Sequence, residues 1–157
     1  MHKASITIAF FWIIGTALMF IMNWDANDMQ FNAILASPNI EAIFGRDDYG
    51  RSIIYRLFAG FKNSIEIILV VSLISCTTGV VIGTVSGYIG GKFDAIVSFI
   101  INLFMSFPGI LLAIAFAAML NPGKLNLILA LSIGGWVSYA RLSRGQALMV
   151  RNFEYVK

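Results

Sequence analysis

The charged side chains that could carry chemistry are concentrated in one polar stretch from Phe44 to Arg56. Five of these thirteen residues are charged, although 59% of the whole sequence is hydrophobic. The stretch combines aspartates and arginines with two glycines, a mixture that is typical of ion pairs and tight turns. We therefore predict a folded polar element, in which Arg51 and Arg56 pair with Asp47, Asp48 or lipid headgroups.

Other kinds of chemistry lack the residues they need. The sequence contains one histidine, His2, and one cysteine, Cys76, so it offers no intramolecular disulfide and no clustered His/Cys metal site. It has no Gly-x-x-x-x-Gly-Lys-[Ser/Thr] phosphate loop, which argues against ATP hydrolysis by the chain itself. An intramembrane protease would need a histidine or two aspartates inside the apolar segments. We predict no catalytic residue, no cofactor and no metal, and the small net charge of +3 does not indicate nucleic acid as a partner.

The apolar segments indicate the class of protein. Only 12% of the residues are charged, compared with about 25% in a soluble domain, and the mean hydropathy is +0.83. A bilayer core requires about 20 apolar residues per helix, and the period-two alternation of strands is missing. We therefore predict an all-α, polytopic membrane protein whose four transmembrane helices lie in the uncharged runs 4–22, 67–91, 95–123 and 125–140. The fourth run is short and needs a further turn at either end.

The N-terminal run 4–22 has two interpretations. A basic start before an apolar stretch is also typical of a cleaved signal peptide, but the run is long and no small-x-small cleavage site follows it. An uncleaved transmembrane helix over residues 1–22 is favoured. With the N-terminus inside, the two sides carry six and five Lys/Arg residues, so charge alone does not decide orientation. Because the outer basic residues share their segment with acidic ones, we adopt a cytoplasmic N-terminus.

With the N-terminus in the cytoplasm, the predicted spans divide the chain into three parts. Residues 1–22 form the first helix, residues 23–63 a periplasmic segment, and residues 64–157 the membrane core. Within the periplasmic segment we predict a short amphipathic helix from about Gly50 to Phe61, lying along the membrane surface. Its apolar residues Tyr49, Ile53 and Leu57 follow i, i+4, i+8 spacing.

A row of glycines marks the run 67–91. They recur every four residues, on one helical face, and are Gly79, Gly83, Gly87 and Gly91. Each costs roughly 0.5–1 kcal/mol relative to alanine, so the smooth face must serve a purpose. It can let another helix approach closely, line a moving seam of a transport pathway, or do both. Gly90 and Gly91 then permit a tight turn, after which Asp94 is expected to cap the next helix.

The last two runs contain their own interruptions. Pro108 removes a helical hydrogen bond and predicts a kink, where the Ser106 hydroxyl can satisfy a freed carbonyl. Asn121-Pro122-Gly123-Lys124 predicts a turn, and Trp136 and Tyr139 are expected to be interfacial anchors. Arg141 and Arg144 lie three residues apart on one face at the predicted exit from the membrane. That pair suits anionic headgroups or an acidic partner, and simple snorkelling explains it equally well.

Three of these motifs resemble the permease subunits of ABC importers for oligopeptides, dipeptides and nickel. The polar stretch resembles their Gly-Thr-Asp-x-x-Gly-Arg-Asp-x-x-Ser-Arg signature, matched here by Gly45, Asp47, Gly50, Arg51 and Arg56, with departures at Arg46, Ser52 and Tyr55. The glycine turn resembles Gly-Tyr-x-Gly-Gly-x-x-Asp, matched by Gly87, Tyr88, Gly90, Gly91 and Asp94. The last segment resembles Trp-x-x-x-x-Arg-x-x-Arg followed by Tyr-Val, matched by Trp136, Arg141, Arg144, Tyr155 and Val156.

The resemblance implies an N-terminal accessory helix followed by the first three helices of a type I importer core, in a cell inner membrane. It implies as partners a second permease subunit, cytoplasmic ATP-binding subunits and an extracytoplasmic substrate-binding protein. Direct contact of Asp47 and Arg51 with that binding protein is the alternative to ion pairs within the polar stretch. It places Phe107 and Pro108 at the translocation path, and it brings Arg141, Arg144, Glu154 and Tyr155 near the loop that docks on the ATPase. Di- or oligopeptides are the first choice of substrate and nickel or a metal chelate the second. No residue in this sequence distinguishes between the two substrate classes.

Two expectations complete the interpretation. The sequence stops at Lys157, just before the Ala-Ala of the family's coupling helix, so we expect these 157 residues alone not to support transport. The alternative class is a small self-assembling pore or helical scaffold, which would not need the three motifs together. A downstream reading frame encoding Ala-Ala and further apolar helices would remove that alternative.

Overall fold

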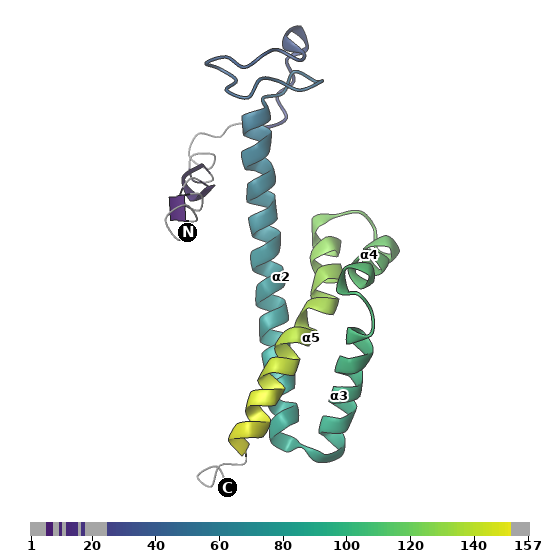
Figure 1. Ribbon diagram of the computed structural model, residues 1–157. Helices are drawn as coiled ribbons and strands as arrows, with labels where there is room; N and C mark the ends of the chain where they lie inside the picture. The colour runs from purple at the N-terminus through teal and green to yellow at the C-terminus, as the bar shows by residue number, and fades with distance from the viewer. Residues whose placement is uncertain (1–5, 8–9, 11, 16, 18–24, 152–157) are drawn as a thin grey trace. The chain divides into compact units, whose positions relative to one another are not determined.

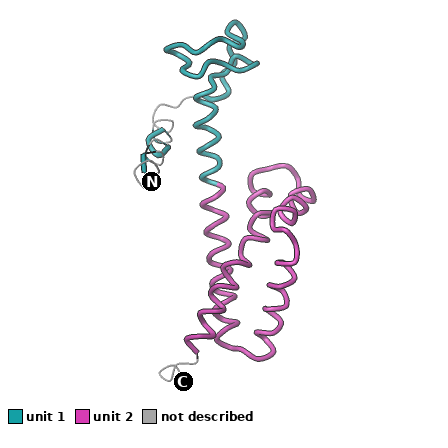
Figure 2. The backbone as a smooth tube through the Cα atoms, viewed as in Figure 1, with its two compact units in different colours: residues 1–66 teal, residues 67–157 magenta. Residues whose placement is uncertain are grey.

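The computed structural model describes residues 6–7, 10, 12–15, 17 and 25–151 (Figure 1). From residue 25 onward these form a 3-10 helix, η1 (Phe31–Ala33), and four α-helices, and no strand occurs in this described part. The prediction of an all-α fold is therefore confirmed. The predicted first membrane helix lies largely outside the described residues, although those described between 6 and 17 are helical. Two compact units divide the chain, residues 1–66 and 67–157 (Figure 2).

Helix α2 (Ile53–Ile89) belongs to both units, because the division falls inside it after Glu66. Its 37 residues correspond to about 55 Å of helix at 1.5 Å per residue, compared with a hydrocarbon core of about 30 Å. The prediction of a separate amphipathic helix over Gly50 to Phe61 is wrong. Helical structure begins only at Ile53 and continues unbroken into the apolar run, since no glycine turn or proline follows to end it.

The first unit is built around the polar insert and the N-terminal end of α2. Its chain from residue 25 to 52 consists of turns and η1, with one isolated antiparallel bridge between Arg46 and Ser52. In the first turns of α2, Phe61 and Phe58 contact Trp12: the Trp12 ring stacks on Phe61 with centroids 4.4 Å apart and meets Phe58 edge-on at 6.0 Å. The insert thus leads directly into a helix whose first turns carry an aromatic cluster.

In the second unit, α2 is followed after one residue by α3 (Gly91–Met105), then by α4 (Gly109–Met119) and α5 (Lys124–Arg151). Val97 and Ile101 of α3 pack with Val137 and Ala140 of α5 to form a small buried core. The turn predicted at residues 121–124 separates α4 from α5, except that its last residue, Lys124, is already the first residue of α5. The fourth run gains the length it lacked, because α5 extends eleven residues beyond Ala140 to Arg151.

The third apolar run departs from prediction at Pro108. Instead of one kinked helix, α3 and α4 are separate and bent by 87°. The Ser106 hydroxyl donates to the Leu103 carbonyl at 2.6 Å, and Phe107 N donates to the Phe104 carbonyl at 3.3 Å, so the helix end is closed before the proline. Trp136, predicted to be an interfacial anchor, lies midway along α5 and packs edge-on against Phe104 with ring centroids 5.8 Å apart.

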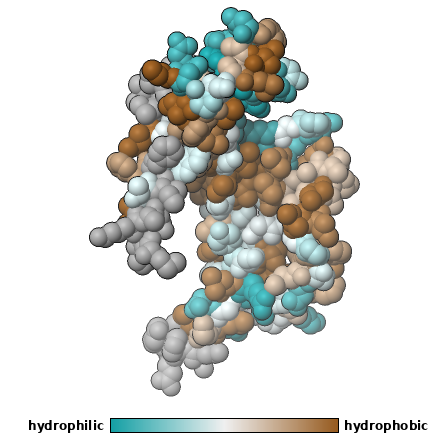
Figure 3. Space-filling view, turned by 45° about the horizontal axis from the view of Figure 1, so that its top comes forward, coloured by the Kyte–Doolittle hydropathy of each residue, from teal (hydrophilic) through white to brown (hydrophobic). Residues whose placement is uncertain are grey.

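The described helices are suited to a membrane. Two of them, α2 and α5, are long and apolar enough to cross a bilayer, and a third span results if the bent pair α3–α4 counts as one. The remaining predicted span, which is the N-terminal one, lies mostly outside the described residues. Large apolar side chains are exposed on these helices (Figure 3), including Phe99 at 67% and Ile110 at 73%. Such surfaces are stable in lipid or against other apolar helices.

Candidate functional site

The polar insert of the first unit is organised around the carboxylate of Asp47. One oxygen, Oδ1, accepts hydrogen bonds from the backbone N–H groups of Tyr49 and Arg51, both at 2.9 Å. The other, Oδ2, accepts from Arg51 Nε at 2.9 Å and from an Arg56 terminal nitrogen at 2.5 Å. The Asp47 side chain is only 11% exposed. The predicted pairing of Arg51 and Arg56 with an aspartate is therefore present, and Asp47 is the partner of both.

Gly45 and Gly50 form the turns on either side of this carboxylate. Both have a positive φ, +75° and +71° respectively, which glycine adopts without steric cost. A Cβ atom on Gly45 would lie 2.7 Å from the Ala36 carbonyl oxygen, and one on Gly50 would collide with the Gln30 carbonyl. The Gly50 carbonyl in turn accepts from Arg46 at 2.9 Å. These two positions require glycine for both conformation and space.

The hydrogen bonds around Asp47 also determine its ionisation. Burial alone would raise the pKa of this carboxyl. The hydrogen bonds from the Arg51 side chain, and from the backbone N–H groups of Arg51 and Tyr49, outweigh burial and hold the pKa far below its usual 3.8. An anion so fully bonded within the insert has little capacity left for an external partner. Asp47 is therefore suited to organising the insert rather than to contacting an external binding protein.

This arrangement gives a testable pH dependence. Because the folded pKa of Asp47 is depressed, its contribution to stability is present above about pH 4 and is lost as the pH falls below that value. NMR titration of the Tyr49 and Arg51 amides, which donate to the carboxylate, should show a midpoint well below 3.8. Asp47→Asn should abolish the titration, whereas Asp48→Asn, at an exposed neighbour, should leave it unchanged. A midpoint at or above the usual value would contradict the assignment.

In the second unit, the glycine row joins α2 to α5. A Cβ atom on Gly79 would meet the Trp136 carbonyl, and one on Gly83 would meet the Ala140 carbonyl and the Ser143 hydroxyl. One on Gly87 would lie 2.7 Å from Ala147 Cβ and 2.8 Å from the Arg144 carbonyl oxygen. The two backbones are thus in direct contact along this seam, which we call the glycine seam (Gly79, Gly83 and Gly87). It faces α5 rather than an open passage.

Gly91 does not belong to the seam. Helix α2 ends at Ile89, and the turn is made by Gly90 and Gly91, with φ of +71° and +59°. A Cβ atom on Gly91 would meet nothing within 4 Å, whereas one on Gly90 would collide with the guanidinium of Arg151. The spacing of four residues therefore continues past the end of α2, and its last glycine, Gly91, belongs to the turn and not to the contact with α5.

The turn between α2 and α3 is fastened to α5 by one carboxylate. Asp94 Oδ1 accepts from the Ser86 hydroxyl at 2.8 Å and from Arg144 Nε at 2.5 Å, and Asp94 Oδ2 accepts from Arg144 Nη2 at 2.7 Å. Ser86 is fully buried, and the Asp94 and Arg144 side chains are 15% and 27% exposed. We call this set the three-helix junction (Ser86 of α2, Asp94 of α3 and Arg144 of α5).

The junction corrects two predictions. Asp94 does not cap α3: the N-cap position is Gly90, which makes no side-chain cap, and the Asp94 carboxylate bonds Arg144 and Ser86 instead. Arg144 accordingly pairs with an internal aspartate rather than with a headgroup or an acidic partner. The physical reason is that a bidentate guanidinium–carboxylate pair is stronger than a hydrogen bond to an exposed helix end.

The remaining predicted residues lie apart from the junction. Arg141 is exposed on α5, and one of its terminal nitrogens lies 3.5 Å from the Met105 sulfur. Phe107 is 54% exposed in the break between α3 and α4, where Pro108 is the N-cap residue of α4. Glu154 and Tyr155 fall outside the described residues. The structure therefore brings the glycine seam, Asp94 and Arg144 together where α2 and α3 meet α5. Phe107 and Pro108 lie elsewhere, in the break between α3 and α4.

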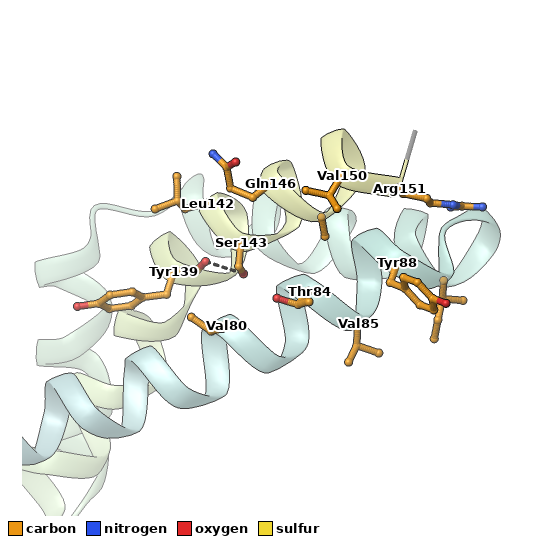
Figure 4. A pocket seen from close by; sticks show the side chains of 12 residues that line it. Val80, Thr84, Val85, Tyr88, Tyr139, Leu142, Ser143, Gln146, Val150 and Arg151 are labelled. Carbon is orange, nitrogen blue, oxygen red and sulfur yellow. Dashed lines mark hydrogen bonds between the residues drawn. The ribbon is translucent and has the colours of Figure 1, made fainter. Parts of the chain in front are cut away.

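A groove runs beside the glycine seam between α2 and α5, with a volume of about 870 Å³ (Figure 4). Its walls are mostly apolar, with Val80 and Tyr88 from α2 facing Leu142 and Val150 from α5. Thr84 and Gln146 supply polar groups, while the Ser143 hydroxyl donates to the Tyr139 carbonyl at 2.9 Å within its own helix. The lining is suited to an apolar chain or helix more than to a charged ligand.

The Asp94–Arg144 pair was missed because it joins residues fifty positions apart. A signal was nevertheless present: Asp94 is the only acidic residue between Glu66 and Glu154, in a segment that contains five Lys/Arg residues. A lone acid in an apolar segment requires a positive partner, since an unpaired charge there is costly. The sequence could therefore have predicted an ion pair, but not which arginine forms it.

Together, the membrane-length helices, the glycine seam and the three-helix junction define an all-α polytopic membrane protein. Residues 79–157 match the family described as "Binding-protein-dependent transport system inner membrane component", and this chain belongs to that family. Its membership confirms the resemblance inferred from the three motifs, and it makes the chain a multi-pass component of an inner membrane. Its relatives include permease proteins of peptide transport systems.

The chain is similar to several peptide and nickel permeases. The probable D,D-dipeptide transport system permease protein DdpC of Escherichia coli K12 is 36% identical over 157 residues, which cover 98% of this chain and 53% of DdpC. The dipeptide permease protein DppC of Bacillus subtilis is 37% identical over 119 residues, or 76% of this chain and 37% of DppC. The nickel permease protein NikC of E. coli K12 is 31% identical over 153 residues, or 98% of this chain and 55% of NikC. The chain spans about half the length of the curated relatives it matches.

Proposed function

We propose that this chain forms the N-terminal part of a permease subunit in an ATP-driven importer of di- or oligopeptides. The observation that carries the proposal is the similarity to a D,D-dipeptide permease across 98% of the chain. Dipeptide and oligopeptide permeases of B. subtilis, at 37% and 36% identity, support the same substrate class. The chain's own contribution is passive: its helices form part of the wall of a pathway.

The partners follow from this role. A second permease subunit completes the pathway, cytoplasmic ATP-binding subunits hydrolyse ATP, and an extracytoplasmic binding protein delivers the peptide. The N-terminus is cytoplasmic, so the polar insert faces the periplasm and the three-helix junction lies at the cytoplasmic side. The region of Arg141, Arg144, Glu154 and Tyr155 then approaches the ATP-binding subunits. The glycine seam supports this proposal as a packing surface, whereas Phe107 and Pro108 remain candidates for the pathway.

A chimera tests the proposal. The aligned part of E. coli DdpC is replaced by these 157 residues, and the chimera is expressed in cells that lack DdpC but retain the rest of the system. We expect ATP-dependent uptake of a labelled D,D-dipeptide and co-purification of the chimera with the ATP-binding subunits. The control is the same chimera carrying Gly83→Leu. This substitution should abolish both the dipeptide uptake and the co-purification with the ATP-binding subunits.

A parallel chimera in NikC separates the substrate classes. Labelled nickel uptake by the NikC chimera, without peptide uptake by the DdpC chimera, would contradict the peptide assignment. Failure of both chimeras to bind the ATP-binding subunits, despite membrane insertion, would contradict the permease function itself. A pore or scaffold would show neither ATP-dependent uptake nor partner binding.

A further inference from the structure

We propose that Asp94 and Arg144 are positioning residues, whose ion pair makes the α2–α3 turn and the C-terminal part of α5 move as one body. The structural part of this inference stands on the contacts of the second unit. Its consequence for transport rests on the proposed function. In a permease, the pair would carry motion of α5 to the turn between α2 and α3.

The geometry singles out this pair as the directional link. The glycine seam brings α2 close to α5, and the core of Val97, Ile101, Val137 and Ala140 brings α3 close to α5. Apolar contacts of this kind are non-directional, so they resist separation better than sliding. The guanidinium fork of Arg144, with contacts of 2.5 and 2.7 Å to the two Asp94 oxygens, fixes both position and orientation.

Ser86 extends the link to a third helix. Its buried hydroxyl donates to the same Asp94 oxygen that Arg144 Nε contacts. Since Ser86 lies in the last turn of α2 and Asp94 in the first turn of α3, the carboxylate bridges the two ends of the turn. Gly90 is the single residue between α2 and α3. The turn is therefore too short to absorb a displacement of one helix relative to the other.

No neighbouring residue can replace Asp94 as the acidic partner of Arg144. Arg151 lies against Gly90 and also acts electrostatically on Asp94. With Asp94 neutralised, Arg144 and Arg151 would be left near each other without an acidic residue of 67–153 to balance them. Repulsion between these two arginines of α5 would then add to the loss of the hydrogen bonds that tie α5 to the turn. Arg141, one turn earlier, contacts Met105 and takes no part.

A distance measurement tests the link in the chain itself. Cys76→Ser leaves no native thiol, and spin labels are placed through Ile96→Cys on α3 and Met149→Cys on α5, where the native residues are 59% and 56% exposed. In lipid nanodiscs the parent should give a narrow distance distribution. Asp94→Asn and Arg144→Gln should each broaden it while the helical circular dichroism stays constant. Arg141→Gln is the matched control and should not change it.

The charge-swapped variant, Asp94→Arg with Arg144→Asp, distinguishes positioning from mere stability. It should restore the narrow distribution, because the pair is rebuilt with its partners exchanged. Unchanged distributions in both single variants, or a broad one in the swapped variant, would overturn the proposal. Should the single variants fail to fold, the swapped variant decides alone: the parent distance supports the link, and any other result refutes it.

Transport supplies the second readout. In the DdpC chimera with its partner subunits, each single variant should lower the amount of peptide imported per ATP hydrolysed by roughly 2- to 30-fold, the range for residues that carry coupling, and the swap should recover it. Equal coupling in all variants would refute the role in transport. Absence of uptake by the parent chimera would count against the proposed function, while the distance measurement would still judge the link.

Discussion

Gly83→Leu is expected to separate α2 from α5 and to lower the free energy of unfolding of the second unit by about 3 kcal/mol or more. A Cβ atom alone at this position collides with the Ala140 carbonyl and the Ser143 hydroxyl. A backbone carbonyl cannot rotate away as a flexible side chain can, so the helices themselves must move apart. The Ser143 hydroxyl would also lose its 3.3 Å contact with the Gly79 carbonyl across the seam.

Gly60→Leu provides the matched control. Gly60 lies in the same helix, and a Cβ atom there would meet nothing within 4 Å. Both variants therefore gain the same apolar side chain and the same helix propensity, and only the close contact differs. Denaturant titration in detergent, followed by the fluorescence of Trp136, should show a loss for Gly83→Leu and little change for Gly60→Leu.

Two results would contradict the packing argument. One is an equal midpoint of unfolding for the two variants. The other is normal co-purification of Gly83→Leu with partner subunits in the chimera.

Gly50→Ala is expected to unfold the polar insert while leaving the second unit intact. Alanine at φ +71° costs roughly 1–2 kcal/mol, and its Cβ would in addition collide with the carbonyl of Gln30. Displacing Gly50 also breaks the contact of its carbonyl with Arg46 and its own N–H bond to the Asp47 carbonyl, at 2.9 and 3.0 Å. The turn that holds Asp47 would then open.

Amide hydrogen exchange over residues 25–52 measures this effect, with exchange in α5 as the internal reference. Gly50→Asn separates the two causes, because asparagine tolerates the left-handed conformation but carries the same Cβ. We expect it to be nearly as damaging as alanine. Native protection in the asparagine variant would show that the conformation alone demands glycine and that the contact with Gln30 does not.

Local pattern was sufficient for much of the architecture. The apolar runs predicted α2 and α5 because a bilayer demands continuous apolar helix, and Asn121-Pro122-Gly123 predicted the turn before α5. The close spacing of Asp47 and Arg51, four residues apart, likewise indicated their ion pair. Each of these features depends on neighbours within about one turn, which is the range that sequence spacing reports.

Errors occurred where one element had to be joined to another. Spacing predicted a separate helix over 50–61, but the continuous helix α2 absorbed it, since the pattern did not reveal that helical structure would continue past Phe61. Pro108 predicted an interruption, but its hydrogen-bonding consequences do not fix an angle. The 87° bend between α3 and α4 accompanies the packing of α4 against α5, which a local pattern cannot contain.

The sequence by itself determined the family, the all-α membrane class and the glycine face of α2. Only the tertiary structure decided that α5 covers the glycine face, that Arg144 rather than Arg141 or Arg151 binds Asp94, and that Ser86 joins them. The reason is physical: helical periodicity determines which side chains share a face, but the choice among arginines depends on where a helix fifty residues away places its guanidinium. A bidentate contact of 2.5 and 2.7 Å tolerates little error in that placement.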